Sequence, residues 1–231
     1  MAATRQPADA FTYVKQYLKS MPLESIGPAL LDEVNKMLWM AAPWRWTLGS
    51  LPATTLVSNQ QDYTIVTPTD FLFLFDGFVS DGANVFRNLQ VEPTLPSDVK
   101  VVGNVSRLSY QGSNTYRTFP KPGTLPASPA QQFILRYKKV APNITNQTQY
   151  TAGQLVMDDD WFWVFQAGVL WKAYQWGDDG RAGGVTIGSN GQAQYTGQLG
   201  AFRDGIRQMA IHEKLPLVEP NDLVNPKQTE K

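Results

Sequence analysis

The stretch that decides the fold is 161-WFWVFQAGVLWKAYQW-176, which is apolar on nearly every side. Three polar residues interrupt the run, and it is shorter than the roughly 20 residues that a bilayer core requires. A helix without a polar face is typical of the buried centre of a globular fold. We expect this helix over about 155–177. Asp158–Asp160 would lie at its first turn, where free backbone amides and the helix dipole favour carboxylates.

Three amphipathic helices are expected to pack around this central one, because apolar residues recur at three- and four-residue spacing. Pro22 and Pro43 end the first two. Pro28 is tolerated if the regular part of the second helix begins there, since the first turn does not use that amide. Glycines weaken the last helix by roughly 1 kcal/mol each relative to alanine. The three helices are predicted over about 8–21, 23–42 and 193–214.

The middle of the chain, about 54–140, changes to a period of two, which indicates strands. Strands that follow one another without helices favour an antiparallel meander or sandwich. The strand from Phe71 to Val79 is apolar on both faces, so both faces should be covered. Pro120–Pro129 is proline-rich and predicts a stiff surface connection. The expected strands are Thr54–Val57, Asp62–Val66, Phe71–Val79, Val85–Val91, Val105–Tyr110, Tyr116–Phe119 and Phe133–Val140.

The fold class predicted by this order is α+β, with two N-terminal and two C-terminal helices around a central antiparallel meander or sandwich. We expect one domain over 1–214, with 54–140 as its β-rich insertion. The proline-punctuated segment 215–231 is expected to be an extended, exposed tail.

Composition restricts the chemistry. The 231 residues include no cysteine, a single histidine, and 20 basic against 20 acidic side chains. Disulfides, thiolate zinc sites and multi-histidine metal sites are therefore excluded. The zero net charge lacks the footprint of a sequence-independent nucleic-acid binder. Met1–Ala10 has no apolar segment typical of a secretory signal. We expect neither a catalytic site nor a cofactor or metal.

Two segments invite a catalytic or ligand-binding interpretation and are better explained otherwise. Gly177–Gly191 is glycine-rich, but no Gly-Lys-Ser/Thr follows and no strand leads in, so a flexible connection is favoured over a phosphate site. Its length still suggests contact with a partner. His212 lies near a helix C-terminus, where an imidazole suits the dipole, and no nucleophile motif accompanies it.

Trp39, Trp44 and Trp46 cluster around Pro43. Large aromatic side chains dominate both cores and interfaces. Three interpretations stay open: the core of a helix-to-sheet junction, a subunit interface, or a platform on which a sugar or base stacks.

The ordered combination of segments resembles the head-to-tail connector (adaptor) proteins of short-tailed bacteriophages. The likeness runs from about residue 8 to 214. It rests on two short helices before Trp44-Arg45-Trp46, and on five further segments. These are Asp62-Tyr63-Thr64-Ile65 with Pro68-Thr69-Asp70-Phe71, Tyr116–Pro122, Phe133–Lys139 with Pro142-Asn143-Ile144-Thr145, Trp161–Trp176, and Gly177–Arg181.

The resemblance implies a non-enzymatic ring, typically of twelve copies, beneath the portal protein at the capsid vertex of the virion. Such a ring assembles in the host cytoplasm, seals the packaged head and docks tail or nozzle proteins. Double-stranded DNA would pass through its channel without sequence-specific binding, and no membrane is involved. The C-terminal tail is implied to reach the portal. The candidate partner-binding residues are Leu217, Val218, Leu223, Val224, Trp44 and Trp46.

Two alternatives belong to other classes. A carbohydrate-binding β-sandwich module, or another tail component, would use Trp44 and Trp46 with the aromatic strands. Its weakness is that such modules are built from two packed sheets without terminal helices. A hydrolase would use scattered carboxylates such as Asp160, with His212, but the sequence displays no convergent site.

Overall fold

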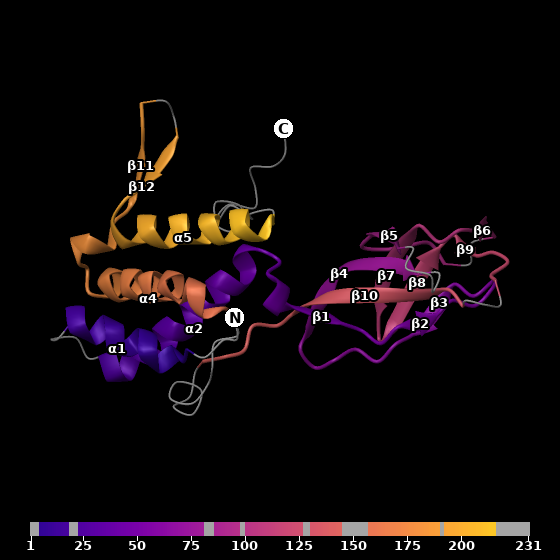
Figure 1. Cartoon of the computed structure of the whole chain (residues 1–231), viewed down its shortest axis with the longest axis horizontal. Helices are drawn as coiled ribbons and strands as arrows, with labels where there is room; N and C mark the ends of the chain where they lie inside the picture. The colour runs from indigo at the N-terminus through magenta and orange to yellow at the C-terminus, as the bar shows by residue number, and fades with distance from the viewer. Residues whose placement is uncertain are drawn as a thin grey trace. The chain divides into compact units, whose positions relative to one another are not determined.

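The chain divides into two compact units (Figure 1). The computed structural model describes residues 5–18, 23–80, 86–97, 100–126, 130–144, 157–189 and 192–215. Met1–Trp46 and Ala141–Lys231 make the helical unit, and Thr47–Val140 makes the sheet unit. The α+β class, with two helices before the strands and two after them, is confirmed. In the part of the chain that the structure describes, no helix has the length and apolar character needed to cross a bilayer.

The helical unit is built around the tryptophan-rich helix, as expected. Helix α4 packs against three other helices and is buried along most of its length (Figure 1). Gly168 lies where the helices approach most closely, because a Cβ there would come within 2.7 Å of both Val34 Cγ1 and Phe202 Cε2. The four helices are α1 (Pro7–Tyr17), α2 (Leu23–Ala41), α4 (Phe162–Trp176) and α5 (Gly197–Glu213).

Helix boundaries differ from the prediction where packing and turns override the periodic pattern. Helix α1 ends at Tyr17, earlier than predicted, and α5 begins at Gly197 because Ala193–Tyr195 form a strand. Helix α2 agrees with its predicted range, and Pro28 lies inside it. The ring of Phe11 lies against Gly27, where an added Cβ would come within 2.5 Å of the ring. This packing of α1 on α2 spans the turn that Pro28 weakens. A 3₁₀ turn, η2 (Asp159–Trp161), precedes α4.

Polar side chains on α2 hold the segment that returns from the sheet unit. The buried Asp32 carboxylate accepts hydrogen bonds from the Ile144 backbone N–H (2.7 Å) and from Lys36 Nζ (2.6 Å). Asn35 Nδ2 donates to the Pro142 carbonyl (3.0 Å). These bonds satisfy backbone groups that would otherwise be costly to bury, and they fix the return path beside α2.

The sheet unit contains one eight-stranded sheet, in the order β1-β10-β4-β5-β7-β8-β3, with β2 also paired to β10. All the expected strands are present, and several short strands of the structure were not predicted from the sequence. The strands of this sheet are β1 (Leu48–Ser50), β2 (Thr54–Thr55), β3 (Asp62–Thr64), β4 (Phe71–Ser80), β5 (Phe86–Val91), β7 (Arg107–Gly112), β8 (Thr115–Phe119) and β10 (Gln132–Lys139).

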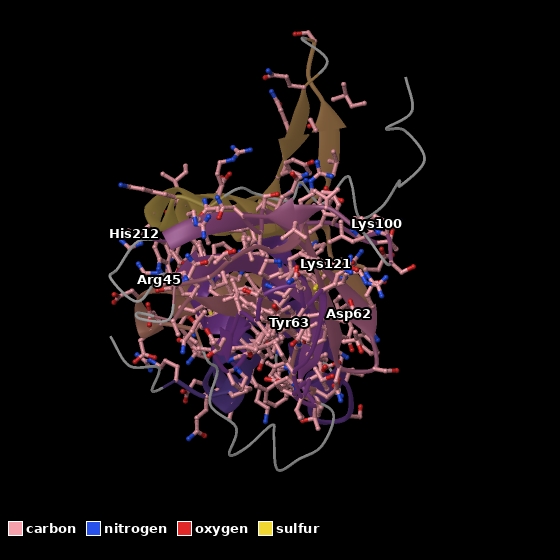
Figure 2. The ribbon with its side chains drawn as sticks, turned by 90° about the vertical axis from the view of Figure 1, so that its right-hand side faces the viewer. Arg45, Asp62, Tyr63, Lys100, Lys121 and His212 are labelled. Atoms are coloured by element: carbon pink, nitrogen blue, oxygen red, sulfur yellow. The ribbon has the colours of Figure 1, made fainter. Side chains whose placement is uncertain are left out.

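The predicted antiparallel meander or sandwich is corrected to a single curled, mixed sheet. Strands β5 and β7 run parallel, because residues 92–106 cross over between them instead of forming a hairpin. The proline-rich connection is also partly a strand. Its Lys121–Pro122 forms β9, which pairs with β6 (Val102–Gly103). The Lys121 N–H donates to the Val101 carbonyl (3.1 Å), which brings Lys121 near Lys100 (Figure 2).

Curling lets the sheet enclose its own core. Tyr63, on the edge strand β3, meets Phe133 of β10 edge-on with ring centroids 4.8 Å apart. Four strands separate β3 from β10 in the sheet order. The Tyr63 hydroxyl also accepts a hydrogen bond from the Val57 N–H (3.1 Å), just beyond β2. A flat sheet would hold these groups far apart, so the two margins of the sheet converge over one core.

One lysine is enclosed in this unit. Lys138, on β10, is almost fully buried, and its Nζ donates to Thr47 Oγ1 (2.5 Å). Burial disfavours the charged ammonium and lowers the pKa of Lys138 to about 8.

The central position of α4 predicts unequal effects for two of its tryptophans. Trp171 is 9% exposed and stacks on Phe202, whereas Trp176 is 52% exposed. Trp171→Ala should lower the free energy of unfolding by roughly 3–5 kcal/mol, and Trp176→Ala by less than about 1 kcal/mol. Urea denaturation followed by circular dichroism measures both. Equal losses would contradict the arrangement.

Lys138 should make stability depend on alkaline pH. Below about pH 8 the folded chain must carry a desolvated ammonium. Between about 8 and 10.5 the unfolded chain binds more protons, so stability rises with pH. Lys138→Met lacks this rise. Between pH 7.5 and 10 the free energy of unfolding of the wild type should therefore rise by about 1–3 kcal/mol relative to that of Lys138→Met. Denaturant titrations across this range test it, with Lys100→Met, at an exposed side chain, as control. Parallel curves for wild type and Lys138→Met would refute it.

Candidate interaction surface

The tryptophan cluster before the sheet unit belongs to the core of the helical unit. Trp44 is fully buried, and its Nε1 donates to the Leu38 carbonyl (2.6 Å). Trp46 stacks on Trp44 with centroids 6.3 Å apart, and meets Trp39 edge-on at 5.1 Å. An enclosed indole offers no surface, which corrects the expectation that Trp44 contacts a partner. Trp46 is only partly buried, and its partner role stays a prediction.

The other candidate partner-binding residues, Leu217, Val218, Leu223 and Val224, lie outside the described residues.

The groups considered for catalysis do not converge. His212 is exposed, lies at the edge of the view in Figure 2, and meets the Trp161 ring edge-on at 5.5 Å. Asp158 occupies the N-cap position of η2, and Asp159 and Asp160 lie in that 3₁₀ turn. The expectation that the acidic run lies in the first turn of α4 is therefore wrong. Asp159 Oδ1 accepts a hydrogen bond from the Arg5 backbone N–H (3.0 Å). Among the described residues, no three His, Cys, Asp or Glu side chains gather as a metal site would require.

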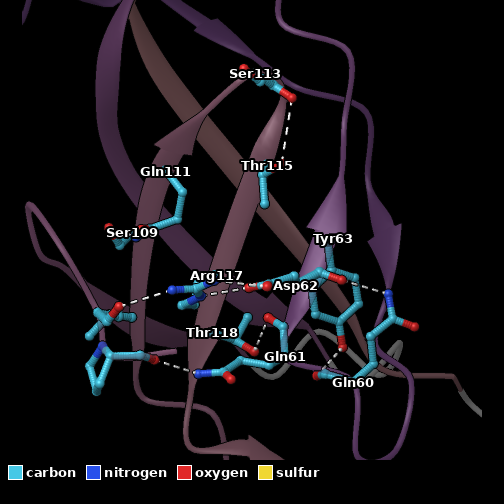
Figure 3. A network of polar contacts seen from close by, with 12 residues as sticks. Gln60, Gln61, Asp62, Tyr63, Ser109, Gln111, Ser113, Thr115, Arg117 and Thr118 are labelled. Atoms are coloured by element: carbon cyan, nitrogen blue, oxygen red, sulfur yellow. Dashed lines mark hydrogen bonds and ion pairs between the residues drawn. The ribbon is translucent and has the colours of Figure 1, made fainter. Parts of the chain in front are cut away.

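The densest polar network braces the edge of the curled sheet (Figure 3). Arg117 Nε and Nη2 donate to Asp62 Oδ1 (2.7 Å) and Oδ2 (2.9 Å), and this bidentate pair raises the pKa of Arg117. Arg117 Nη1 also donates to the Leu95 carbonyl (3.3 Å), and Gln61 Nε2 donates to the Pro96 carbonyl (2.9 Å). The charges are neutralised within the network, which therefore ties β3 and β8 to the crossover segment.

The glycine-rich segment is a β-hairpin where a flexible connection was expected. The 3₁₀ turn η3 (Gly180–Ala182) and the strand β11 (Val185–Ile187) lie within it. Strand β11 pairs antiparallel with β12 (Ala193–Tyr195), which follows just beyond it. The hairpin projects from the helices between α4 and α5 (Figure 1). The alternating apolar and polar residues of Val-Thr-Ile indicate a strand of this hairpin. The surrounding glycines outweighed this pattern in the prediction.

Two glycines fix the base of the hairpin. Gly183 has φ +79°, and a Cβ there would come within 1.8 Å of the Thr196 carbonyl oxygen. Gly197 has φ +60° and lies against the same point. The Gly184 N–H donates to Thr196 Oγ1 (3.2 Å) across the base. The backbone crossing is thus too close for any side chain, and the hairpin leaves the helices at a set angle.

Side chains next to the base add further restraint. Arg181 Nη2 donates to Asp179 Oδ2 (2.6 Å), and this partner lowers the pKa of Asp179 to about 2. The Arg181 guanidinium lies over the Tyr174 ring, 4.4 Å from its centroid. On the other side, the Arg203 guanidinium lies 3.6 Å from the centroid of Tyr195. Both contacts connect the hairpin to the helices that flank it.

The hairpin has one apolar and one polar face. Val185 pairs with Tyr195 and Ile187 with Ala193, whereas Thr186 pairs with Gln194 between them. Because side chains alternate along a strand, the first two pairs share a face and the third lies on the other. On the apolar face, Val185 is 57% exposed and Ile187 is 78% exposed. Large apolar side chains presented together in this way mark an interaction surface.

Further exposed apolar side chains lie on both units. In the sheet unit, Leu72 and Phe73 of β4 are exposed, which corrects the expectation that both faces of this strand are covered. In the helical unit, Trp163 and Ile211 are exposed at one end of the α4–α5 pair, and Trp176 is exposed at the end that carries the hairpin. The candidate functional site is this set of separate apolar surfaces.

No protein-family model matches the chain, and no curated protein matches it.

The glycine crossing predicts that position 183 cannot carry a side chain. Gly183→Ala should open the hairpin, because the new Cβ would overlap the Thr196 carbonyl. Gly184→Ala is the matched control, because nothing lies within 4 Å of its Cβ position. Amide hydrogen exchange should lose protection over Val185–Tyr195 in the first variant alone, with protection of α4 unchanged. Equal protection in both variants would show that the crossing does not hold the hairpin.

Proposed function

We propose that this chain is a structural protein of a phage virion that forms a ring between portal and tail. The observation that carries the proposal is the set of exposed apolar side chains on separate surfaces, Ile187 and Val185 on the hairpin, Trp163 and Ile211 at the far end of the helices, and Leu72 and Phe73 on the sheet. The resemblance to head-to-tail connectors in the order of segments supports the same function.

A closed ring requires two different surfaces on each subunit, because each copy contacts one neighbour on each side in a heterologous manner. Obligate interfaces of this kind are large, rich in aromatic side chains and poor in charge. The chain has 12% aromatic and 17% charged residues, and it presents apolar side chains on more than one surface. These properties suit repeated contact between identical subunits.

The charge distribution suits a conduit for DNA better than a clamp. Each phosphate that a protein neutralises adds affinity, so a channel that must release DNA should offer few free cations. The net charge is zero. Several cations are paired within the chain: Arg117 with Asp62, Arg136 with Asp76, and Lys172 with Glu33.

In this proposal the ring contains about twelve copies, as the resembling family implies. It lies at the head-to-tail interface, seals the packaged head and receives tail or nozzle proteins, while 215–231 reaches the portal. The carbohydrate-binding alternative loses support, because Trp44 is enclosed and the strands form one curled sheet instead of two packed sheets.

The proposal is tested by measuring the mass of the assembled particle. The full chain, alone and mixed with the portal protein of the same virus, should give a discrete ring of about twelve copies or a stable portal complex. Mass photometry with size-exclusion chromatography and light scattering detects either. A chain that stays monomeric and never joins the portal would overturn the proposal, as would hydrolytic turnover that a single side-chain change abolishes.

A further inference from the structure

We propose that the apolar face of the β11–β12 hairpin packs against the helical unit of a neighbouring copy of this chain. This inference rests on the proposed ring and names the element that joins one subunit to the next.

The hairpin is short, yet it exposes large apolar side chains. Each strand has three residues, and an isolated two-stranded hairpin is at best marginally stable in water. Yet its apolar face presents Val185 and Ile187 to solvent. Arg203 from α5 covers the Tyr195 end of that face. A surface of this kind gains stability when a second surface removes it from water.

The hairpin segment lacks charged side chains. No charged residue occurs between Arg181 and Arg203, although 17% of the chain is charged. Charged residues are depleted at the centre of protein interfaces. An acidic or basic partner would find no complementary charge on this segment, so the matching surface is itself apolar and uncharged.

The hairpin is held in place before any partner binds. The Gly183 crossing, the Thr196 bond to Gly184 and the stacking of Arg203 on Tyr195 restrain its base. A preformed element loses less conformational entropy on binding, so more of its apolar contact contributes to affinity.

The receiving surface must lie on another copy. Trp163 and Ile211 are exposed at the end of the α4–α5 pair where Trp161 meets His212, and the hairpin leaves the opposite end. Helix α4 has 15 residues, which corresponds to about 22 Å. The two strands project away from the helices in Figure 1, so the hairpin does not lie along its own helices toward the Trp163 end. Exposed apolar side chains therefore lie at both ends of one unit, and heterologous association requires two such separate contact points.

The test places one negative charge on either face of the same strand. Ile187→Asp puts it on the apolar face, and Thr186→Asp, the matched control, puts it on the polar face. At the concentration where wild type is half assembled, Ile187→Asp should reduce the assembled fraction by about tenfold or more, and Thr186→Asp by less than about twofold. Mass photometry of the full chain measures both, and circular dichroism confirms that each variant folds.

A second measurement does not depend on a charged variant. Because the chain has no cysteine, Ile187→Cys and Thr186→Cys each introduce a unique thiol. Assembly should slow maleimide labelling of the Ile187→Cys thiol by about tenfold or more relative to dilute monomer, because the interface covers it. The Thr186→Cys thiol should change by less than about twofold under the same conditions.

The outcomes separate this inference from the proposed function. Rings that form equally well with Ile187→Asp, and that leave the Ile187→Cys thiol accessible, would overturn the hairpin contact while the ring itself stands. A wild-type chain that stays monomeric at every concentration and with the portal protein would overturn both. Loss of assembly in both aspartate variants would show that the two faces are not distinguished, and would also overturn the inference.

Discussion

Burial of α4 is the constraint on which the rest of the helical unit depends. A helix with apolar side chains around most of its circumference must be covered on several sides, and one neighbouring helix cannot do this. Helices α1 and α2 come from the start of the chain and α5 from its end, so both ends must meet around α4. The sheet unit is therefore an insertion between α2 and α4, and Asp32 and Asn35 fix the point where the chain returns.

The sheet unit buries its apolar side chains by curling around them. Its margins converge where Tyr63 meets Phe133, so the unit encloses a core without help from a second sheet. Curling leaves an outer face, and part of that face on β4 is apolar and exposed. Each unit is thus closed inside and incomplete outside.

Periodicity predicted the helices and main strands because apolar spacing reports directly on burial. Periodicity did not predict features that depend on contacts between residues far apart in the sequence. The parallel pairing of β5 with β7 depends on a crossover that local pattern does not encode. Trp44 was kept as a partner-binding candidate because an aromatic cluster looks alike in a core and at an interface. The hairpin was missed because its glycines were interpreted as flexibility. Gly183 and Gly197 instead permit a close backbone crossing, which only coordinates reveal.

That crossing has a consequence for how the molecule can diversify. Main-chain atoms at the base of the hairpin set its direction. The side chains nearer its end determine which surface it can contact. Residues 185–187, 193 and 194 can therefore vary in chemistry without redirecting the hairpin. Substitutions at these positions during evolution could change the contact surface of the hairpin, and the packing of the helical unit would not have to change.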